Sequence, residues 1–433
     1  MNGRNSRRGL LGVLAAVLLA VTAPLAACGS SNDSGSGPQS IRFVWWGNQD
    51  RANATNKAIA LFEQRNPNIH VQTEFSGYAA YVQKLTTEIA GGAAPDLIQL
   101  DRATFGEYEQ KHVLSDLTQY QNQLRTNSIP DNLLSGGRAD GGLYAVPGGQ
   151  TAQMVAYDPA LFARAGVTVP GNGWTWQQFT TDMAKVGAVT GEPGTTDFGW
   201  AVDWFDSWLH QRGKALYTSD GKLGFAQADL EQFWNLTGSL RQNKGVSAPQ
   251  ATTKMDGSIQ NSAMVTKQAA SEFNYDSNLT SYISSYGSPV AAAPLPSDGT
   301  STKDSGMAAL PPVYYAVPKM SAHRDAAVKL LDFLVNDPDA GKLLGTTRGL
   351  PPNSDVRKSV CGNAAAGDKT VCDYEQSVAA RLGPSQSWVW PAGSSEIKTD
   401  FQQVYDNVIF GKSSVADAAR QVISDAQQSL GSS

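Results

Sequence analysis

One segment in the middle of this 433-residue chain combines indole rings with a carboxylate. Trp200, Asp203, Trp204 and Trp208 recur at helical spacing, so a helix would place them on one face. A tryptophan stripe is often part of a core, but a carboxylate among indole rings must be paired or functional. Indole faces stack on the apolar C–H face of a pyranose ring, and carboxylates accept hydrogen bonds from its hydroxyl groups. The segment is therefore a candidate carbohydrate site, with a buried core stripe as the alternative.

Polar side chains also follow two predicted strands, at the point where each strand ends. Gln49 and Arg51 come after the strand expected at 41–46, and Asp101 comes directly after the strand expected at 97–100. The carboxyl ends of parallel strands are where open α/β sheets bind ligands. Arginine donates hydrogen bonds, aspartate accepts them and glutamine does both, which suits a ligand rich in hydroxyl groups. For Asp101 the alternative is a cap of the following helix.

Three further candidates lie later in the chain. Asn274 follows a short apolar segment, and Arg348 lies just before the break at Pro351 and Pro352. Arg348 is a candidate for the border of a cleft, with an exposed surface charge as the alternative. Trp388 lies in a loop bounded by prolines, and aromatic residues exposed in loops are often functional.

The sequence lacks the residue patterns typical of catalysis. A Gly-x-Ser-x-Gly nucleophile motif does not occur, and the four histidines are scattered without the spacing of metal ligands. Gly411 and Lys412 resemble the end of a phosphate loop, but Asp406 replaces the first glycine of that motif. No catalytic residue, metal or cofactor is therefore predicted. A surface glycoside hydrolase using Asp203 and Asp206 is the alternative from another class, and a surface adhesin without a ligand is a third.

The order of the expected elements favours an α/β fold. Strands are expected at 41–46, 69–75 and 97–100. Helices are expected between them, and this alternation is typical of a parallel sheet covered by helices. Breaks rich in proline and glycine follow at 147–149, 306–312 and 348–352. Such breaks are candidates for hinges between two lobes, because hinges absorb dihedral changes in a few residues.

The N-terminus is typical of an exported protein. A basic start and a short apolar stretch precede the four residues LAAC, which end at Cys28 and resemble a bacterial lipobox. We therefore expect a signal peptide at 1–27 and a lipidated Cys28 that opens a flexible tether at 28–40. A plain signal peptide with an incidental cysteine is the alternative, and a twin-arginine route of export stays open.

The net charge and the cysteine content further limit the kinds of ligand and the covalent links expected of this protein. The formal net charge is −5 and the sequence has no basic cluster, which argues against nucleic acid as a ligand. Of the three cysteines, Cys28 is assigned to the lipid. Cys361 and Cys372 are then an even pair in an exported protein, so a disulfide between them is predicted.

Several short motifs, in this order along the chain, resemble the family 1 extracellular solute-binding proteins of ABC importers, in the group similar to maltose-binding protein. The motifs are the lipobox, VWWG at 44–47, FEQRNP at 62–67, YVQKL at 81–85, AGGAAPDLI at 90–98, AVP at 145–147, WTW at 174–176, the apolar helix at 327–334 and GLP at 349–351. The resemblance implies a two-lobed periplasmic-binding-protein-like fold of type II, α/β in class. Each lobe would be a mainly parallel sheet flanked by helices and hinged around a central cleft.

The resemblance also implies a division of the chain and a set of partners. The expected segments are 41–147 and 307–347 for lobe 1, and 148–306 and 348–433 for lobe 2. A member of the family would be exported, and the lipobox would anchor it by lipid to the outer face of the cell membrane. It would bind a carbohydrate as a monomer and deliver it to the permease subunits of an ABC transporter.

Family resemblance further singles out particular ligand-binding positions. Related proteins bind sugar hydroxyls through an acidic residue at the position of Asp101, and they carry a carboxylate and an aromatic ring near Asp203 and Trp204. Ligand-facing residues are also expected around Asn274 and Tyr275. The predicted ligand-binding residues are Gln49, Arg51, Asp101, Asp203, Trp204, Asn274, Arg348 and Trp388.

Overall fold

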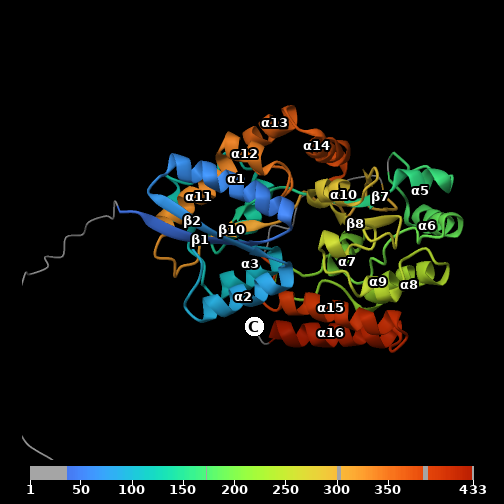
Figure 1. Cartoon of the computed structure of the whole chain (residues 1–433). Coiled ribbons are helices and arrows are strands. Elements are labelled where there is room, and N and C mark those ends of the chain that lie inside the picture. Colours follow the sequence, from blue (N-terminus) through green and yellow to red (C-terminus); the bar gives the residue numbers. More distant parts are fainter. Residues whose placement is uncertain (1–36, 172, 300–303, 384–388, 432–433) are drawn as a thin grey trace, which may run out of the picture. The chain divides into compact units, whose positions relative to one another are not determined.

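The computed structural model describes residues 37–171, 173–299, 304–383 and 389–431 (Figure 1). The predicted lipidation site Cys28 and the candidate ligand residue Trp388 lie outside the described residues. Residues 38–433 form one compact unit, which contains all the helices and strands of the described chain.

The strands of the described chain are short and the helices numerous. The strands are β1 (Gln39–Trp46), β2 (Ile69–Ser76), β3 (Leu97–Leu100), β4 (Arg138–Ala139), β5 (Gly142–Leu143), β6 (Val146–Pro147), β7 (Gln153–Tyr157), β8 (Ser271–Tyr275), β9 (Ala291–Ala293) and β10 (Tyr314–Ala316). The α-helices that precede β9 are α1 (Gln49–Arg65), α2 (Tyr78–Ala90), α3 (Arg102–Gln110), α4 (Asp131–Leu134), α5 (Pro159–Arg164), α6 (Trp176–Thr190), α7 (Val202–His210), α8 (Gln227–Gln242), α9 (Pro249–Thr252) and α10 (Leu279–Ser285). The later ones are α11 (Arg324–Asn336), α12 (Pro338–Leu344), α13 (Ser354–Gly362), α14 (Ala366–Val378), α15 (Ser394–Ile409) and α16 (Val415–Gly431). Short 3₁₀ helices are η1 (Leu117–Tyr120), η2 (Ser135–Gly137), η3 (Ile259–Asn261), η4 (Asp276–Asn278) and η5 (Ala379–Arg381).

The larger sheet defines the first lobe and has the strand order β2-β1-β3-β10-β6. β1 pairs in parallel with both β2 and β3, whereas β10 runs antiparallel to β3 and β6. Successive strand residues point to opposite faces. Phe43 and Trp45 therefore pack with the helices of one face, and Val44 packs with those of the other. The strands predicted at 41–46, 69–75 and 97–100 are observed.

Helices cover both faces of this sheet. α1, α11 and α12 lie on one side and α2 and α3 on the other (Figure 1). On α1 the buried residues include Ala58 and Phe62, which recur at helical spacing and face the sheet.

A second, smaller sheet has the strand order β8-β7-β9 and defines the second lobe. Its strands differ from the expected mainly parallel arrangement, because β7 is antiparallel to both neighbours. The direction of a strand depends on the path that the chain takes between that strand and its neighbours in the sheet. The sequence of the strand itself does not encode this path. The lobe's core is rich in aromatic residues. At the start of α6, Thr175 and Gln178 form a capping box, and the rings of Trp174 and Phe179 are in contact with centroids 5.4 Å apart.

Three extended segments run between the two lobes. We call residues 148–152, between β6 and β7, the first crossing. The second crossing is residues 306–313, before β10, and the third is residues 345–353, between α12 and α13. Backbone hydrogen bonds tie it to the other two at Gly148–Val313, Thr151–Leu310 and Gln150–Leu350. The approach is close, since a Cβ atom on Gly149 would lie 1.9 Å from the carbonyl oxygen of Arg348. The breaks predicted at 147–149 and 306–312 lie where the chain passes from a strand of one of these sheets to a strand of the other, and the break predicted at 348–352 lies between α12 and α13. The expected division of the chain into lobe segments stays a prediction.

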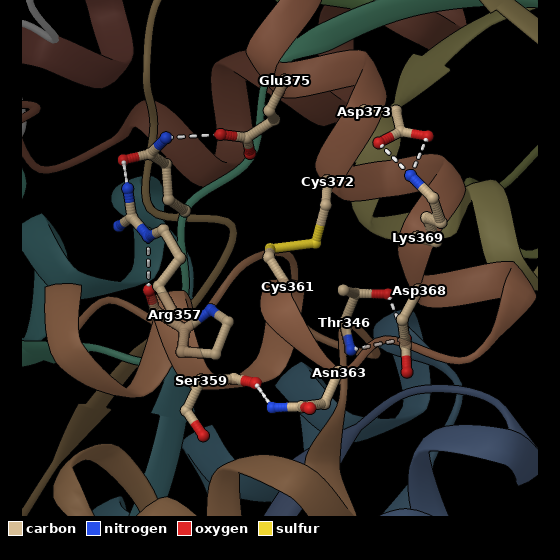
Figure 2. The surroundings of a disulfide bond; sticks show 12 residues. Thr346, Arg357, Ser359, Cys361, Asn363, Asp368, Lys369, Cys372, Asp373 and Glu375 are labelled. Carbon is tan, nitrogen blue, oxygen red and sulfur yellow. Dashed lines mark hydrogen bonds and ion pairs between the residues drawn. A yellow bond between two sulfur atoms is a disulfide. The ribbon is translucent and has the colours of Figure 1, made fainter.

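A disulfide joins Cys361 of α13 to Cys372 of α14 (Figure 2). Both helices follow the third crossing and pack against each other. Within the described ranges no helix is long and apolar enough to cross a membrane.

Candidate functional site

Asp101 lies at the carboxyl end of β3 and is the N-cap of α3. Its Oδ1 accepts hydrogen bonds from the backbone N–H and the hydroxyl of Thr104, at 2.8 Å and 2.7 Å. Thr104 in turn accepts a bond from the Asp101 backbone, which completes a capping box. The helix-cap interpretation of Asp101 is therefore confirmed, and it occupies one of the two carboxylate oxygens.

The second oxygen of Asp101 faces a tyrosine and a lysine. Tyr78 at the start of α2 donates its hydroxyl to Oδ2 at 2.6 Å, and Lys398 Nζ of α15 lies 4.0 Å from the same atom. Burial by itself would raise the pKa of Asp101. Lys398, the Tyr78 hydroxyl and the Thr104 donors outweigh burial and hold that pKa below its ordinary value.

Asp203 occupies the first turn of α7 in the second lobe and faces the same lysine. Its Oδ2 lies 3.8 Å from Lys398 Nζ, and its Oδ1 accepts a hydrogen bond from the Tyr275 hydroxyl at 3.1 Å. The Asp203 carboxylate raises the pKa of Lys398 against the opposing effect of burial, and Asp101 adds to the rise. Burial and Asp203 together raise the pKa of the Tyr275 hydroxyl, which therefore stays a donor.

We call this group the Lys398 cluster. Its members are Tyr78, Asp101, Asp203, Tyr275 and Lys398. The two predicted carboxylates, one from each lobe, thus meet at one ammonium group. Their side chains are 18% and 27% exposed, and that of Lys398 is 36% exposed, so ligand hydroxyls can reach the carboxylates. The cluster can accept hydrogen bonds from a ligand through its carboxylates and donate them through the ammonium, whereas both phenol protons are already donated to the carboxylates.

Aromatic rings flank the cluster on both sides. Trp204 lies 5.2 Å from Tyr275 between ring centroids, and Trp46 meets Tyr78 edge to face at 5.5 Å. Trp204 itself is only 7% exposed, because α7 is buried along most of its length. The core-stripe interpretation therefore holds for most of the Trp204 indole, and Trp208 is buried with it. Only a small edge of the predicted stacking surface is open.

Neither predicted arginine joins the Lys398 cluster. Arg51 lies on the inner side of α1 and donates to the carbonyl oxygens of Trp46 and Thr347, at 3.2 Å and 2.9 Å. Burial, aided by the nearby Arg348, lowers the pKa of Arg51 to about 9. These bonds tie the start of α1 to the end of β1 and to the third crossing.

Arg348 is likewise a buried structural residue, so its interpretation as a surface charge is wrong. It is 4% exposed and donates to Gln99 Oε1 at 3.0 Å and to Thr55 Oγ1 at 2.8 Å. Its guanidinium lies 5.8 Å from the ring centroid of Trp45. The sequence could not show that the long side chain points inward beneath α1.

Gln49 and Asn274 are also placed apart from the cluster. Gln49 is exposed and donates to Asn53 on the same helix at 2.9 Å. Asn274 donates to the Tyr282 hydroxyl at 2.8 Å, on the face of β8 opposite to Tyr275. Because strand side chains alternate, Tyr275 and not Asn274 faces Asp203.

Asp206 contacts other residues of the second lobe. Its carboxylate accepts from the backbone N–H of Leu216 at 3.0 Å and lies 3.5 Å from His210, so it serves the lobe's own packing. Three members of the cluster, Tyr78, Tyr275 and Lys398, are absent from the ligand-binding residues predicted from the sequence, although the resemblance pointed to the surroundings of Tyr275. Tyr78 fits one apolar position of a helix, and Lys398 stands in a polar helical stretch without any local signal.

Three comparisons with known proteins bear on this arrangement. Residues 46–340 match the family described as bacterial extracellular solute-binding protein. A family 1 solute-binding protein from Alicyclobacillus acidocaldarius is similar, with 28% identity, 92% of this chain and 99% of that chain covered, and a TM-score of 0.64. A periplasmic oligogalacturonide-binding protein from Yersinia enterocolitica shares the fold at 19% identity, with 91% and 99% coverage and a TM-score of 0.79.

Curated relatives match over shorter stretches. A protein of Brucella abortus (strain 2308) named as a binding protein is 25% identical over 210 residues, which are 46% of this chain and 49% of the relative. The chain thus spans about half the length of the curated relatives it matches.

Fold and comparisons together define a class: a type II periplasmic-binding-protein-like α/β fold with two lobes joined by three crossings. The chain belongs to the bacterial extracellular solute-binding proteins. Members of this family serve ABC-type importers by binding a substrate outside the cell, and they are not catalytic. The family resemblance noted in the sequence is confirmed.

Proposed function

We propose that this protein captures a carbohydrate between its two lobes and delivers it to the permease of an ABC transporter. The observation that carries the proposal is the meeting of Asp101 and Asp203, from different lobes, at Lys398. A ligand that binds both carboxylates touches both lobes at once, and it stabilises the closed arrangement by its differential affinity for that arrangement.

The chemistry of the Lys398 cluster suits a polyol. Each carboxylate already accepts from one tyrosine and retains lone pairs for ligand hydroxyl groups. Lys398 donates to sugar oxygens and offsets one of the two negative charges. The open edges of Trp46 and Trp204 supply apolar surface for the C–H groups of a sugar ring.

Solved structures of the same fold support a saccharide as ligand. One is the Yersinia protein in complex with saturated digalacturonic acid, and another is a Streptomyces glaucescens receptor in complex with acarbose, at 17% identity and a TM-score of 0.74. The saccharides are ligands of those two proteins. Because their sequence identity to this chain is low, the similarity shows a shared fold and not a shared ligand.

The proposed partners and location follow from the family and the N-terminal sequence. The protein acts as an exported monomer, anchored by a lipid on Cys28 to the outer face of the cell membrane, and it contacts the permease subunits. A Streptomyces antibioticus protein named as a lipoprotein, 26% identical over 182 residues, is in keeping with the anchor.

A thermal-shift screen tests the ligand class. The panel contains maltose, acarbose, digalacturonic acid and common monosaccharides, with an amino acid mixture as the comparison. Ligand at a hundredfold excess over its dissociation constant stabilises the native state by about 2.7 kcal/mol, which raises the midpoint clearly. A rise with amino acids and with none of the sugars would reject the carbohydrate assignment. Chromatography of the sugars afterwards separates a binder from a hydrolase, because only a hydrolase changes them.

Solution scattering tests the closure. The radius of gyration should fall when the sugar that raises the midpoint is added. Tight binding without any compaction would place the ligand in one lobe and contradict a site shared by Asp101 and Asp203.

A further inference from the structure

Two buried carboxyl groups hold the first crossing, away from the Lys398 cluster. Asp276 of η4 is fully buried, and its Oδ1 accepts from the Thr151 hydroxyl at 2.6 Å and from the Ala152 backbone at 3.2 Å. Glu375 of α14 is 4% exposed, and its Oε2 accepts from Gln150 Nε2 at 2.5 Å. Three consecutive residues of the crossing are therefore bound to these two carboxyls.

The other oxygen of each carboxyl is buried without a hydrogen-bond donor. These atoms are Asp276 Oδ2 and Glu375 Oε1. η4 and α14 pack against each other, and each carboxyl acts electrostatically on the other. Two ionised carboxylates this close in a protein interior repel each other strongly, whereas one shared proton converts the repulsion into a hydrogen bond.

The charged and titratable neighbours do not neutralise the pair by direct contact. Arg357 of α13 donates to Gln150 Oε1 at 2.9 Å and to the Pro351 carbonyl at 2.9 Å, so its hydrogen bonds go to neighbours of Glu375. Its charge lowers the pKa of Glu375 without offsetting the rise that burial causes. The Tyr374 hydroxyl donates to the Gln153 carbonyl at 2.6 Å. Arg381 of η5 acts on Tyr374 rather than on the pair.

The disulfide fixes the helices that carry these neighbours. Cys361 lies one turn after Arg357 on α13, and Cys372 lies one turn before Glu375 on α14 (Figure 2). The two side chains that bind Gln150 are thus held at a set separation by a covalent bond between their helices.

We propose that Asp276 and Glu375 share a single proton, and that this proton fastens the first crossing, so that the opening of the two lobes is linked to pH. When the proton is lost to water, both carboxyls are charged and repel each other. They can move apart when the first crossing, to which both are hydrogen-bonded, also moves. A second proton is not needed, because Gln150 and Thr151 already satisfy the outer oxygens.

The direction of the pH effect follows from the pKa values of the pair. Burial is the largest cause that raises the pKa of both carboxyls, and it raises that of Glu375 to about 7 against the hydrogen bond from Gln150. The present arrangement therefore holds its proton where separated carboxyls, with an ordinary glutamate value of 4.5, have lost theirs. Its stability falls as pH rises from that ordinary value and goes on falling through about 7, because the pKa of Asp276 is raised together with that of Glu375.

The decisive variant is Glu375→Gln. Its amide donates to Asp276 Oδ2 and its carbonyl oxygen accepts from Gln150, so it imitates the protonated pair at every pH. In the wild type without ligand, the equilibrium constant for opening should rise by up to about tenfold per pH unit within the window. The radius of gyration should rise with it, and Glu375→Gln should show neither change. Asp276→Asn is the second variant, in case the first folds poorly.

Glu272→Gln is the matched control. Glu272 is also buried with a raised pKa, but it bonds to Ser262 and Tyr282 inside the second lobe. Its replacement should flatten part of the pH dependence of the thermal midpoint and leave the pH response of the radius of gyration intact. A wild-type radius that does not change with pH would overturn the proposal, as would a response that persists in both pair variants. No ligand is used, so this outcome is independent of the carbohydrate assignment.

Discussion

Replacement of Asp101 separates its role in folding from its proposed role in binding. Asp101 caps α3 through Oδ1 and accepts from Tyr78 through Oδ2. Asp101→Ala removes the cap and leaves the half-buried Tyr78 hydroxyl without its acceptor. Asp101→Asn keeps an N-cap of equal quality but removes the negative charge, and its NH2 group replaces the oxygen that accepts from Tyr78, so that hydrogen bond must reverse its direction.

The magnitudes distinguish the two variants. Loss of the cap costs about 1 kcal/mol, and loss of the acceptor of a half-buried hydroxyl costs up to about 1 kcal/mol more, because water can replace the acceptor. Asp101→Ala should therefore lower the free energy of unfolding by about 2 kcal/mol. Asp101→Asn weakens only the Tyr78 bond and a partly exposed ion pair with Lys398, at about 1 kcal/mol in total. A charged acceptor for a sugar hydroxyl is worth about 1 kcal/mol more than a neutral one, so affinity should fall about fivefold in Asp101→Asn.

Calorimetric titration with the sugar found in the screen, together with urea unfolding, measures both effects. Asp158→Asn is a close control. Asp158 caps α5 through Oδ1 and accepts from the Tyr286 hydroxyl through Oδ2 at 2.8 Å, in the second lobe and outside the cluster. It should show the same small loss of stability and no loss of affinity. Wild-type affinity in Asp101→Asn would reduce Asp101 to a helix cap and refute the reasoning.

Three other predictions concern separate parts of the molecule. Tyr275→Phe removes the hydroxyl that donates to Asp203 and should weaken sugar binding with little change in the thermal midpoint. Trp204→Ala should instead lower the free energy of unfolding by about 3–5 kcal/mol, because the indole is buried. Urea unfolding of both variants checks this, and equal stabilities would contradict the burial argument. Joint replacement of Cys361 and Cys372 by serine should lower the free energy of unfolding by about 3 kcal/mol, and thiol labelling of the unreduced wild type should find neither cysteine free. Cys28→Ala should release the protein to the medium or leave an unprocessed precursor, as judged by membrane fractionation, and a processed variant that stays with the membrane would rule out the lipid anchor.

The sequence by itself determined the class of the protein and much of the first lobe. The short β-rich run that forms β1, buried on both faces, and the alternation of strands and helices up to β3 are local patterns, so they could be read without coordinates. Clusters of proline and glycine marked all three crossings, because those residues have distinct backbone preferences. Asp101 and Asp203 were also found, since a carboxylate at a strand end or among indoles is unusual wherever it occurs.

Only the tertiary structure decided what those carboxylates face. Lys398 lies far along the chain in a polar helix, and its role depends on how α15 packs against α3. The inward direction of Arg51 and Arg348, and the choice of Tyr275 over Asn274, depend on which face of an element meets the core. The pairing of Asp276 with Glu375 joins residues about a hundred positions apart. Local propensity does not encode such contacts, because they are set by long-range packing that sequence spacing does not report.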